Sequence, residues 1–261
     1  MERFLFTKLS MLIVIALVLQ MHGYEGCLEK ERTALLEIKE LFLNSSVNID
    51  YDRVNSKLGS WVDDRVSDCC NWNRVECNTT TLRVINLSLF EILYYKSLSL
   101  SPILNFSMFQ PFEELQSLNL SRNFLKGYVN IRGAGLANLK NLEVLDLSQN
   151  YELSGTGQEL ESLKQLKILN LGWNNFNSSI LSYLTRLISL KTLILQGNNL
   201  KDFNTKQGAG LANLRNLEVL DLSQNYELSG TGQELIIFLL VSFDFLKYHN
   251  NRHAHKEYVM L

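Results

Sequence analysis

The sequence predicts an elongated α/β solenoid, in which short parallel strands line a concave face behind a disulfide-stapled helical cap at the N-terminus. Three observations lead to this prediction. A phrase of alternating leucines and polar residues recurs from Leu115 onward, an amphipathic segment precedes it, and four cysteines cluster in the N-terminal third. Stacked units of this kind contact only their neighbours and together present one long surface. We therefore expect this chain to act by binding.

The recurring phrase has five clear copies: LQSLNLSRNFL, LEVLDLSQNYEL, LKILNLGWNNF, LKTLILQGNNL and LEVLDLSQNYEL again. The second leucine of each copy advances in steps of 27, 24, 24 and 27, falling at Leu118, Leu145, Leu169, Leu193 and Leu220. These steps lie within the roughly 20 to 29 residues of the leucine-rich repeat.

A weaker first copy, Leu82 to Leu87, precedes these five and places Phe90 where the asparagine should stand. Its marker residue, Ile85, lies 33 residues before Leu118, which exceeds every other step, so we expect an insertion in the first turn of the solenoid. We assign residues 85–235 to one degenerate and five clear repeats.

Alternation within each phrase turns one row of side chains inward and the other toward solvent. The residues expected to face outward on the concave side are Gln116, Ser117, Asn119, Ser121, Glu143, Asp146, Ser148, Lys167, Asn170, Gly172, Trp173, Lys191, Thr192, Ile194, Gln196, Glu218, Asp221 and Ser223. We predict that ligand binding uses the middle of this set: Trp173, Lys167, Asn170, Lys191, Thr192, Ile194, Gln196, Asp146 and Asp221. Trp173, beside Ile194, is the strongest candidate anchor, because tryptophan is enriched at binding hot spots. Packing of its ring against the neighbouring loop is the alternative.

An asparagine follows each strand, at Asn123, Asn150, Asn174, Asn198 and Asn225. In this fold such side chains satisfy buried backbone groups, so we assign them a structural role. The block from Gly133 to Leu160 recurs as Gly208 to Leu235 with one change, Lys140 to Arg215. The offset between the two copies spans three whole repeats, so the second copy keeps the register.

Both ends of the chain differ from the repeats. Residues 1–23 have basic residues, the apolar run Leu9 to Leu19 and a polar end, which is typical of a signal peptide. That run is about half of the roughly 20 residues that cross a membrane, so we expect a cleaved signal peptide rather than a signal anchor. We predict no membrane span after signal removal. Residues 236–261 lack repeat asparagines and capping cysteines, and we expect a divergent tail produced by a truncated reading frame. Its histidines, His249, His253 and His255, resemble a loose metal motif, but we predict no metal site.

The charges argue against a nucleic-acid partner, and the sequons fit an exported chain. Lys and Arg number 25 and Asp and Glu number 27, and the net charge of -2 suggests no nucleic-acid partner. Glycosylation sequons occur at Asn44, Asn78, Asn86, Asn105, Asn119 and Asn177. A glycan on Asn119 would shield the first repeats. In an exported chain the four cysteines are expected to form disulfides, in one of three possible connectivities, because the paired spacing of a zinc site is absent.

A cap over residues 24–84 is predicted to cover the apolar edge of the first repeat. Its segment Leu28 to Leu43 places Leu28, Leu35, Ile38, Leu41 and Phe42 on one helical face. The motifs that follow, LGSW, SDCCNWNRVEC and TTTLRVINLSL, resemble the N-terminal cap of plant leucine-rich-repeat receptors. CCNWNRVEC and PFEELQSLNLSRN are similar to plant receptor-like proteins, which are membrane-anchored receptors without a kinase domain.

This resemblance covers residues 24 to about 235. It implies the disulfides Cys27 with Cys69 and Cys70 with Cys77, and it places Trp61 and Trp72 in the cap core. Arg74 stands where many relatives have glycine. After the repeat asparagine the family continues Leu-x-Gly-x-Ile-Pro, whereas this chain has LKGYV, LSGTG, FNSSI and LKDF. The convex side is therefore expected to be less regular than the family pattern.

No phosphate loop and no arrangement of nucleophile, base and acid stands out in the sequence, so we predict neither an enzyme nor a cofactor. The resemblance implies an extracellular, apoplastic module whose full-length relatives sit in the plasma membrane. It would recognise a peptide or protein ligand, with a co-receptor as a further partner, in signalling or defence. Two alternatives remain: a soluble inhibitor of secreted wall-degrading enzymes such as polygalacturonase, and a truncated product without an independent role.

Overall fold

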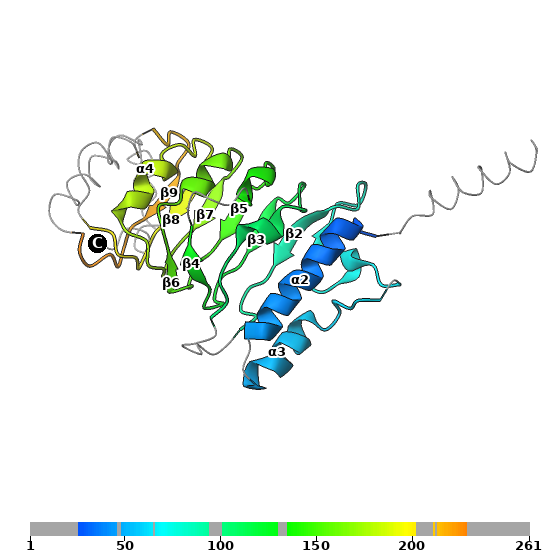
Figure 1. The fold of residues 1–261 in the computed structure, drawn as a ribbon. Helices are drawn as coiled ribbons and strands as arrows, with labels where there is room; N and C mark the ends of the chain where they lie inside the picture. The colour runs from blue at the N-terminus through cyan, green and yellow to red at the C-terminus, as the bar shows by residue number, and fades with distance from the viewer. Residues whose placement is uncertain are drawn as a thin grey trace, which may run out of the picture.

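The computed structural model has the predicted solenoid, with a helical cap at one end and a row of parallel strands behind it (Figure 1). It describes residues 26–45, 48–64, 66–93, 101–129, 135–201, 211 and 213–228. The predicted signal peptide, the tail 236–261 and its three histidines lie outside these described residues. Within the described residues, no helix is long and apolar enough to cross a membrane.

The cap begins with two helices that contact each other, α2 (Glu29–Ser45) and α3 (Asn48–Leu58). Helix α2 buries Leu35, Ile38 and Phe42, as its amphipathic pattern predicts. Leu28 is 42% exposed because it precedes the first turn of the helix, and Leu41, at the edge of the apolar stripe, is only half-buried. The apolar face is therefore narrower than expected.

Two disulfides staple the cap internally. Cys27 is bonded to Cys69 and Cys70 to Cys77, which is the pairing that the family resemblance implies. Trp61 and Trp72 are buried and stack with their ring centroids 6.0 Å apart, which confirms that they are cap core. This part of the cap contains η1 (Cys69–Asn71) and β1 (Val75–Cys77).

A seven-stranded sheet runs from the cap through the described repeats, where β1 is antiparallel to its neighbour and the other strands are parallel. The parallel strands are β2 (Val84–Ser88), β3 (Ser117–Asn119), β5 (Val144–Asp146), β7 (Ile168–Asn170), β8 (Thr192–Ile194) and β9 (Val219–Asp221). Their register pairs Leu118, Leu145, Leu169, Leu193 and Leu220 in turn. The spacing predicted for the five clear repeats is confirmed.

The first repeat is aligned differently from the prediction. Leu87, rather than Ile85, pairs with Leu118, so this repeat is shorter than expected and the asparagine position falls on Ile92 instead of Phe90. A shift of two residues leaves every side chain on the same face of a strand. The alternating pattern alone could therefore not distinguish the two registers.

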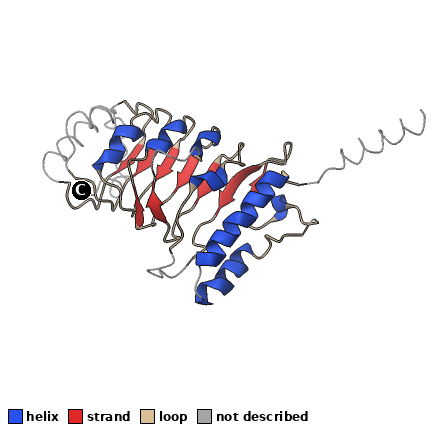
Figure 2. Cartoon of the chain, viewed as in Figure 1, coloured by secondary structure: helices blue, strands red, loops and turns tan. Residues whose placement is uncertain are grey.

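Short helices form a second row beside the strands (Figure 2). They are η2 (Phe106–Phe109), η3 (Leu136–Asn138), η4 (Gln158–Ser162), η5 (Ser178–Ile180) and α4 (Leu181–Leu184). A two-stranded parallel sheet of β4 (Lys126–Tyr128) and β6 (Glu152–Ser154) follows the first asparagine turns. Stacked leucines fill the space between these layers, and Phe109 and Phe112 close the core toward the cap.

The five asparagines form a buried ladder that links neighbouring repeats, as predicted. The Oδ1 atom of Asn150 accepts hydrogen bonds from the backbone N–H groups of Asn123 and Leu125, at 3.0 and 2.9 Å. Its Nδ2 atom donates to the carbonyls of Leu120 and Leu147. The other asparagines donate in the same way, so each strand exit has its backbone groups satisfied inside the solenoid.

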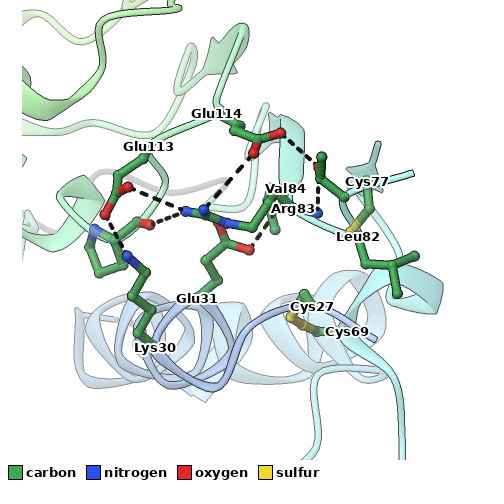
Figure 3. A network of polar contacts seen from close by, with 12 residues as sticks. Cys27, Lys30, Glu31, Cys69, Cys77, Leu82, Arg83, Val84, Glu113 and Glu114 are labelled. Atoms are coloured by element: carbon green, nitrogen blue, oxygen red, sulfur yellow. Dashed lines mark hydrogen bonds and ion pairs between the residues drawn. A yellow bond between two sulfur atoms is a disulfide. The ribbon is translucent and has the colours of Figure 1, made fainter. Parts of the chain in front are cut away.

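A charged network joins the cap to the first repeats (Figure 3). The buried carboxylate of Glu31 accepts hydrogen bonds from Arg83 Nε at 2.8 Å and from the Val84 N–H at 3.2 Å. Glu113 lies 4.0 Å from the same guanidinium and also binds Lys30 of α2. The cap helix is thus held by charge as well as by apolar packing.

Candidate ligand-binding surface

The concave face is formed by the strand residues that alternate with the buried leucines. The first row across the sheet, from β3 to β9, is Ser117, Val144, Ile168, Thr192 and Val219. Ile168 is 40% exposed, whereas the others are half-buried. The sequence interpretation omitted Ile168, although the sheet register aligns it with Ser117 and Thr192. It provides an apolar surface in the middle of the face.

Two ion pairs lie beside this row, each between adjacent repeats. Lys167 Nζ is 2.7 Å from a carboxylate oxygen of Glu143, and Lys191 Nζ is 2.9 Å from one of Glu218. Both lysines belong to the predicted site. Because each lysine is paired with an acid, this edge of the face presents mixed rather than uniformly positive charge.

The next row carries Asn119, Asp146, Asn170, Ile194 and Asp221. The Oδ1 atoms of Asp146, Asn170 and Asp221 accept hydrogen bonds from the backbone N–H two residues later, at 2.9 to 3.0 Å. These predicted ligand residues therefore also terminate their strands. Ile194 interrupts this polar row, and its side chain borders Gly172. Ile168 on β7 and Ile194 on β8 therefore give the middle of the face two apolar side chains.

Trp173 lies where the chain leaves β7, with a left-handed backbone (φ 57°). Its ring covers Gly197 of the next repeat, where an added Cβ would be 2.7 Å from the ring. The side chain remains 38% exposed. One side of the indole therefore packs against the neighbouring loop, which was the alternative to ligand binding, while part of the ring stays available to a ligand.

Three of the residues predicted to face outward are buried. Ser121 and Ser148 are 3% and 7% exposed, and Gly172 is buried as well. They follow the strands, at the point where the backbone turns away from the concave face, and Ser121 Oγ donates to Asn119 Oδ1. The prediction continued the strand alternation past the end of each strand at these positions. Gln116 and Lys191 are exposed and Thr192, Ile194 and Gln196 are half-buried, as residues of an open face should be.

The sequons fall into two groups. Asn44, Asn105 and Asn177 are exposed, whereas Asn78, Asn86 and Asn119 are half-buried. Asn119 lies on β3, and its Oδ1 accepts bonds from both the N–H and the hydroxyl of Ser121. The described residues contain no cluster of three or more metal-ligating side chains.

The repeated strands, the asparagine ladder and the stapled cap define the protein as a leucine-rich-repeat solenoid of plant type. Residues 28–78 match the family described as the leucine rich repeat N-terminal domain. Over 152 residues the chain is 40% identical to Receptor-like protein 56 of Arabidopsis thaliana, covering 58% of this chain and 15% of that protein. Over 248 residues it is 40% identical to Receptor like protein 21 of the same species, covering 90% and 21%. These matches identify the chain as a plant leucine-rich-repeat protein of the receptor-like kind.

The chain spans about a fifth or less of the length of these relatives. Among solved structures, it is similar to the leucine-rich-repeat ectodomain of the plant membrane receptor kinase GASSHO1/SCHENGEN3 from Arabidopsis thaliana, in complex with CASPARIAN STRIP INTEGRITY FACTOR 2. The TM-score is 0.54 at 28% identity, covering 73% of this chain and 21% of that one.

Proposed function

We propose that the chain is an extracellular binding module of the receptor-like type, which recognises a peptide or protein ligand on its concave face in signalling or defence. It acts by binding, not by catalysis. The observation that carries this proposal is the exposure of Ile168 and part of Trp173 in the middle of a regular parallel sheet, beside two ion pairs. An apolar centre surrounded by polar groups is the usual arrangement of a protein interface.

Two comparisons support this proposal. The relatives bear the name receptor-like protein, and the similar ectodomain of GASSHO1/SCHENGEN3 is in complex with CASPARIAN STRIP INTEGRITY FACTOR 2. The acidic and basic side chains beside Ile168 favour a ligand with both acidic and basic groups flanking an apolar residue. A co-receptor is proposed as a second partner that would contact the complex once the ligand is seated.

The test is affinity capture from plant extracellular fluid on the immobilised secreted chain, with bound peptides and proteins identified by mass spectrometry. Ile168→Arg places a bulky charge in the centre of the concave face. Ile188→Arg is the matched control, because Ile188 is 60% exposed and lies outside the strands. We expect a ligand that the wild type and Ile188→Arg retain and Ile168→Arg loses. Equal retention by all three chains would contradict recognition on the concave face, and inhibition of fungal polygalacturonase would favour the inhibitor alternative.

A further inference from the structure

A pocket of about 540 Å³ lies on the flank of the solenoid, outside the concave face. We call it the flank pocket; its lining includes Tyr128, Thr156, Asn175, Asn177, Asn199 and Lys201. Tyr128 ends β4, and Ser154, also in the lining, ends β6, so the pocket opens beside the two-stranded sheet. Its volume lies within the roughly 300 to 1,000 Å³ of small-molecule sites.

The chemistry of the lining suits a sugar. Amide and hydroxyl groups predominate, and its lysine, Lys201, is ion-paired with Glu227 at 2.7 Å. Tyr128 is 75% exposed and offers an aromatic face with a hydroxyl at its end. Sugar rings present C–H groups on one face and hydroxyls around the edge, which matches an aromatic wall among amides. The pocket carries little net charge, so it does not select for a strongly ionic ligand.

One lining residue is itself a sequon asparagine. Asn177 is exposed and begins the sequence Asn177-Ser178-Ser179. Its Oδ1 atom accepts hydrogen bonds from the N–H of Ser179 at 3.0 Å and from its hydroxyl at 2.6 Å. These bonds use the oxygen of the amide, and the nitrogen, which is the atom that receives a glycan, lies on the other side of the group. An attached sugar therefore starts at the wall of the pocket.

We propose that Asn177 is glycosylated and that the first sugars of its glycan lie in the flank pocket against Tyr128. The occupant is thus supplied by the chain itself. Gly155, another lining residue, has φ 124°, and an added Cβ would be 2.8 Å from backbone atoms of Val129. Because glycine has no Cβ, the chain after β6 can lie close to the backbone of Val129, which fixes the position of this part of the wall.

Asn105 provides an internal control. It is an exposed sequon asparagine with the same local geometry, because it precedes a 3-10 helix and its Oδ1 accepts the N–H of Ser107 at 3.0 Å. It does not line the flank pocket. A glycan on Asn105 should extend into solvent, so any difference between the two glycans reports on the pocket rather than on the sequon.

The experiment uses the full chain expressed in plant cells with kifunensine, which keeps all N-glycans in the oligomannose form that endoglycosidase H cleaves. Glycopeptide mapping gives the occupancy of Asn105 and Asn177, and a time course of native digestion gives the release rate at each. We expect both sites to be occupied and release at Asn177 to be at least tenfold slower. Tyr128→Ala should bring the two rates within threefold, whereas Tyr151→Ala, an exposed tyrosine outside the pocket, should change neither.

Because the inference rests on the secretory part of the proposed function, the outcomes separate the two. A chain that is not secreted and carries no glycan at either site overturns both, whereas a secreted chain without glycan at either site overturns the flank-pocket inference alone. Occupancy of Asn105 without Asn177, equal release rates in the wild type, or a slow rate at Asn177 that Tyr128→Ala leaves unchanged overturns the flank-pocket inference alone.

Discussion

Arg83 Nε lies 2.8 Å from a carboxylate oxygen of Glu31, a residue of the cap helix that is fully buried. The pair joins the residue just before β2 to α2 across 52 residues of sequence. Removal of one partner leaves the other charge buried without compensation, at a cost of roughly 3–5 kcal/mol. We expect Arg83→Met to lower the free energy of unfolding by this order. Urea denaturation followed by tryptophan fluorescence measures it.

The control for that substitution is Arg186→Met. Arg186 is 60% exposed and pairs with Glu161 at 2.6 Å, so its loss should have little effect on stability. A similar loss of stability in the two variants would show that the buried pair has no special role.

The same carboxyl should give the cap a pH dependence. Burial raises the pKa of Glu31 above its ordinary value of 4.5, and hydrogen bonds from Arg83 and Val84 act in the opposite direction. A raised pKa means that the folded chain holds this proton more tightly than the unfolded chain. The resulting stabilisation is complete below pH 4.5 and is lost as the pH rises through the folded value.

Glu31→Gln removes this titration while keeping the shape of the side chain. The wild type should therefore lose stability relative to Glu31→Gln as the pH rises from 4.5. The quantity compared is the free energy of unfolding of the two chains. Urea titrations of both chains across this range measure it. A difference that stays constant with pH would contradict the raised pKa.

The asparagine ladder should be sensitive to single truncations. Asn174 is buried, accepts the N–H of Asn150 at 3.2 Å and donates to the carbonyls of Leu147 and Leu171. Asn174→Ala leaves these groups unsatisfied, which costs roughly 1–3 kcal/mol or more. The adjacent and exposed Asn175 is the matched control, and Asn175→Ala should be close to neutral. Thermal unfolding of the two variants decides whether position, rather than residue type, sets the effect.

The two disulfides should contribute unequally. Cys27 and Cys69 are 42 residues apart, whereas Cys70 and Cys77 are 7 apart. In the chain-entropy description a longer closed loop stabilises more, here by roughly 1.5 kcal/mol. We expect replacement of Cys27 and Cys69 by alanine to lower stability more than replacement of Cys70 and Cys77. The reverse order in denaturant unfolding would mean that native packing, not loop closure, governs the cap.

The concave face gives a prediction for recognition. Once a ligand is captured, Trp173→Ala should weaken its binding about tenfold or more, because a partly buried tryptophan is a frequent hot spot. Tyr151→Ala is the control, since Tyr151 is 49% exposed and does not belong to the concave rows. Affinities measured by calorimetry that agree within twofold would assign the ring to packing over Gly197 alone.

The repeats could be predicted from the sequence because leucines alternate at a fixed period and an asparagine marks each turn. The register of the first repeat was predicted two residues too early, at Ile85 instead of Leu87. The sequence could not reveal this, since strand alternation is unchanged by a shift of two residues. The burial of Glu31 could not be predicted from the sequence either. A glutamate near the start of a helix reads as solvated, and its partner Arg83 lies far along the chain.

The strand positions of the candidate site could be predicted from the sequence. Lys167, Asn170, Lys191 and Ile194 do lie on the strands of the concave face or directly before them. The pairing of Lys167 with Glu143, and the position of Trp173 over Gly197, depend on contacts between repeats that no single repeat encodes. The flank pocket likewise combines side chains from several successive repeats, so no local motif indicates it.

The asparagine ladder also bears on how such an array can grow. Asn150 donates to the carbonyls of Leu120, Leu147 and Ser148, and Asn225 donates to those of Leu195, Leu222 and Ser223. Every donor and acceptor in the second set lies three whole repeats beyond its counterpart in the first. Because the hydrogen bonds between neighbouring repeats are the same, a duplicated stretch of whole repeats can form the same hydrogen bonds wherever it is inserted. Unequal recombination between such units can therefore lengthen the gene product without requiring any compensating substitution at the new junction.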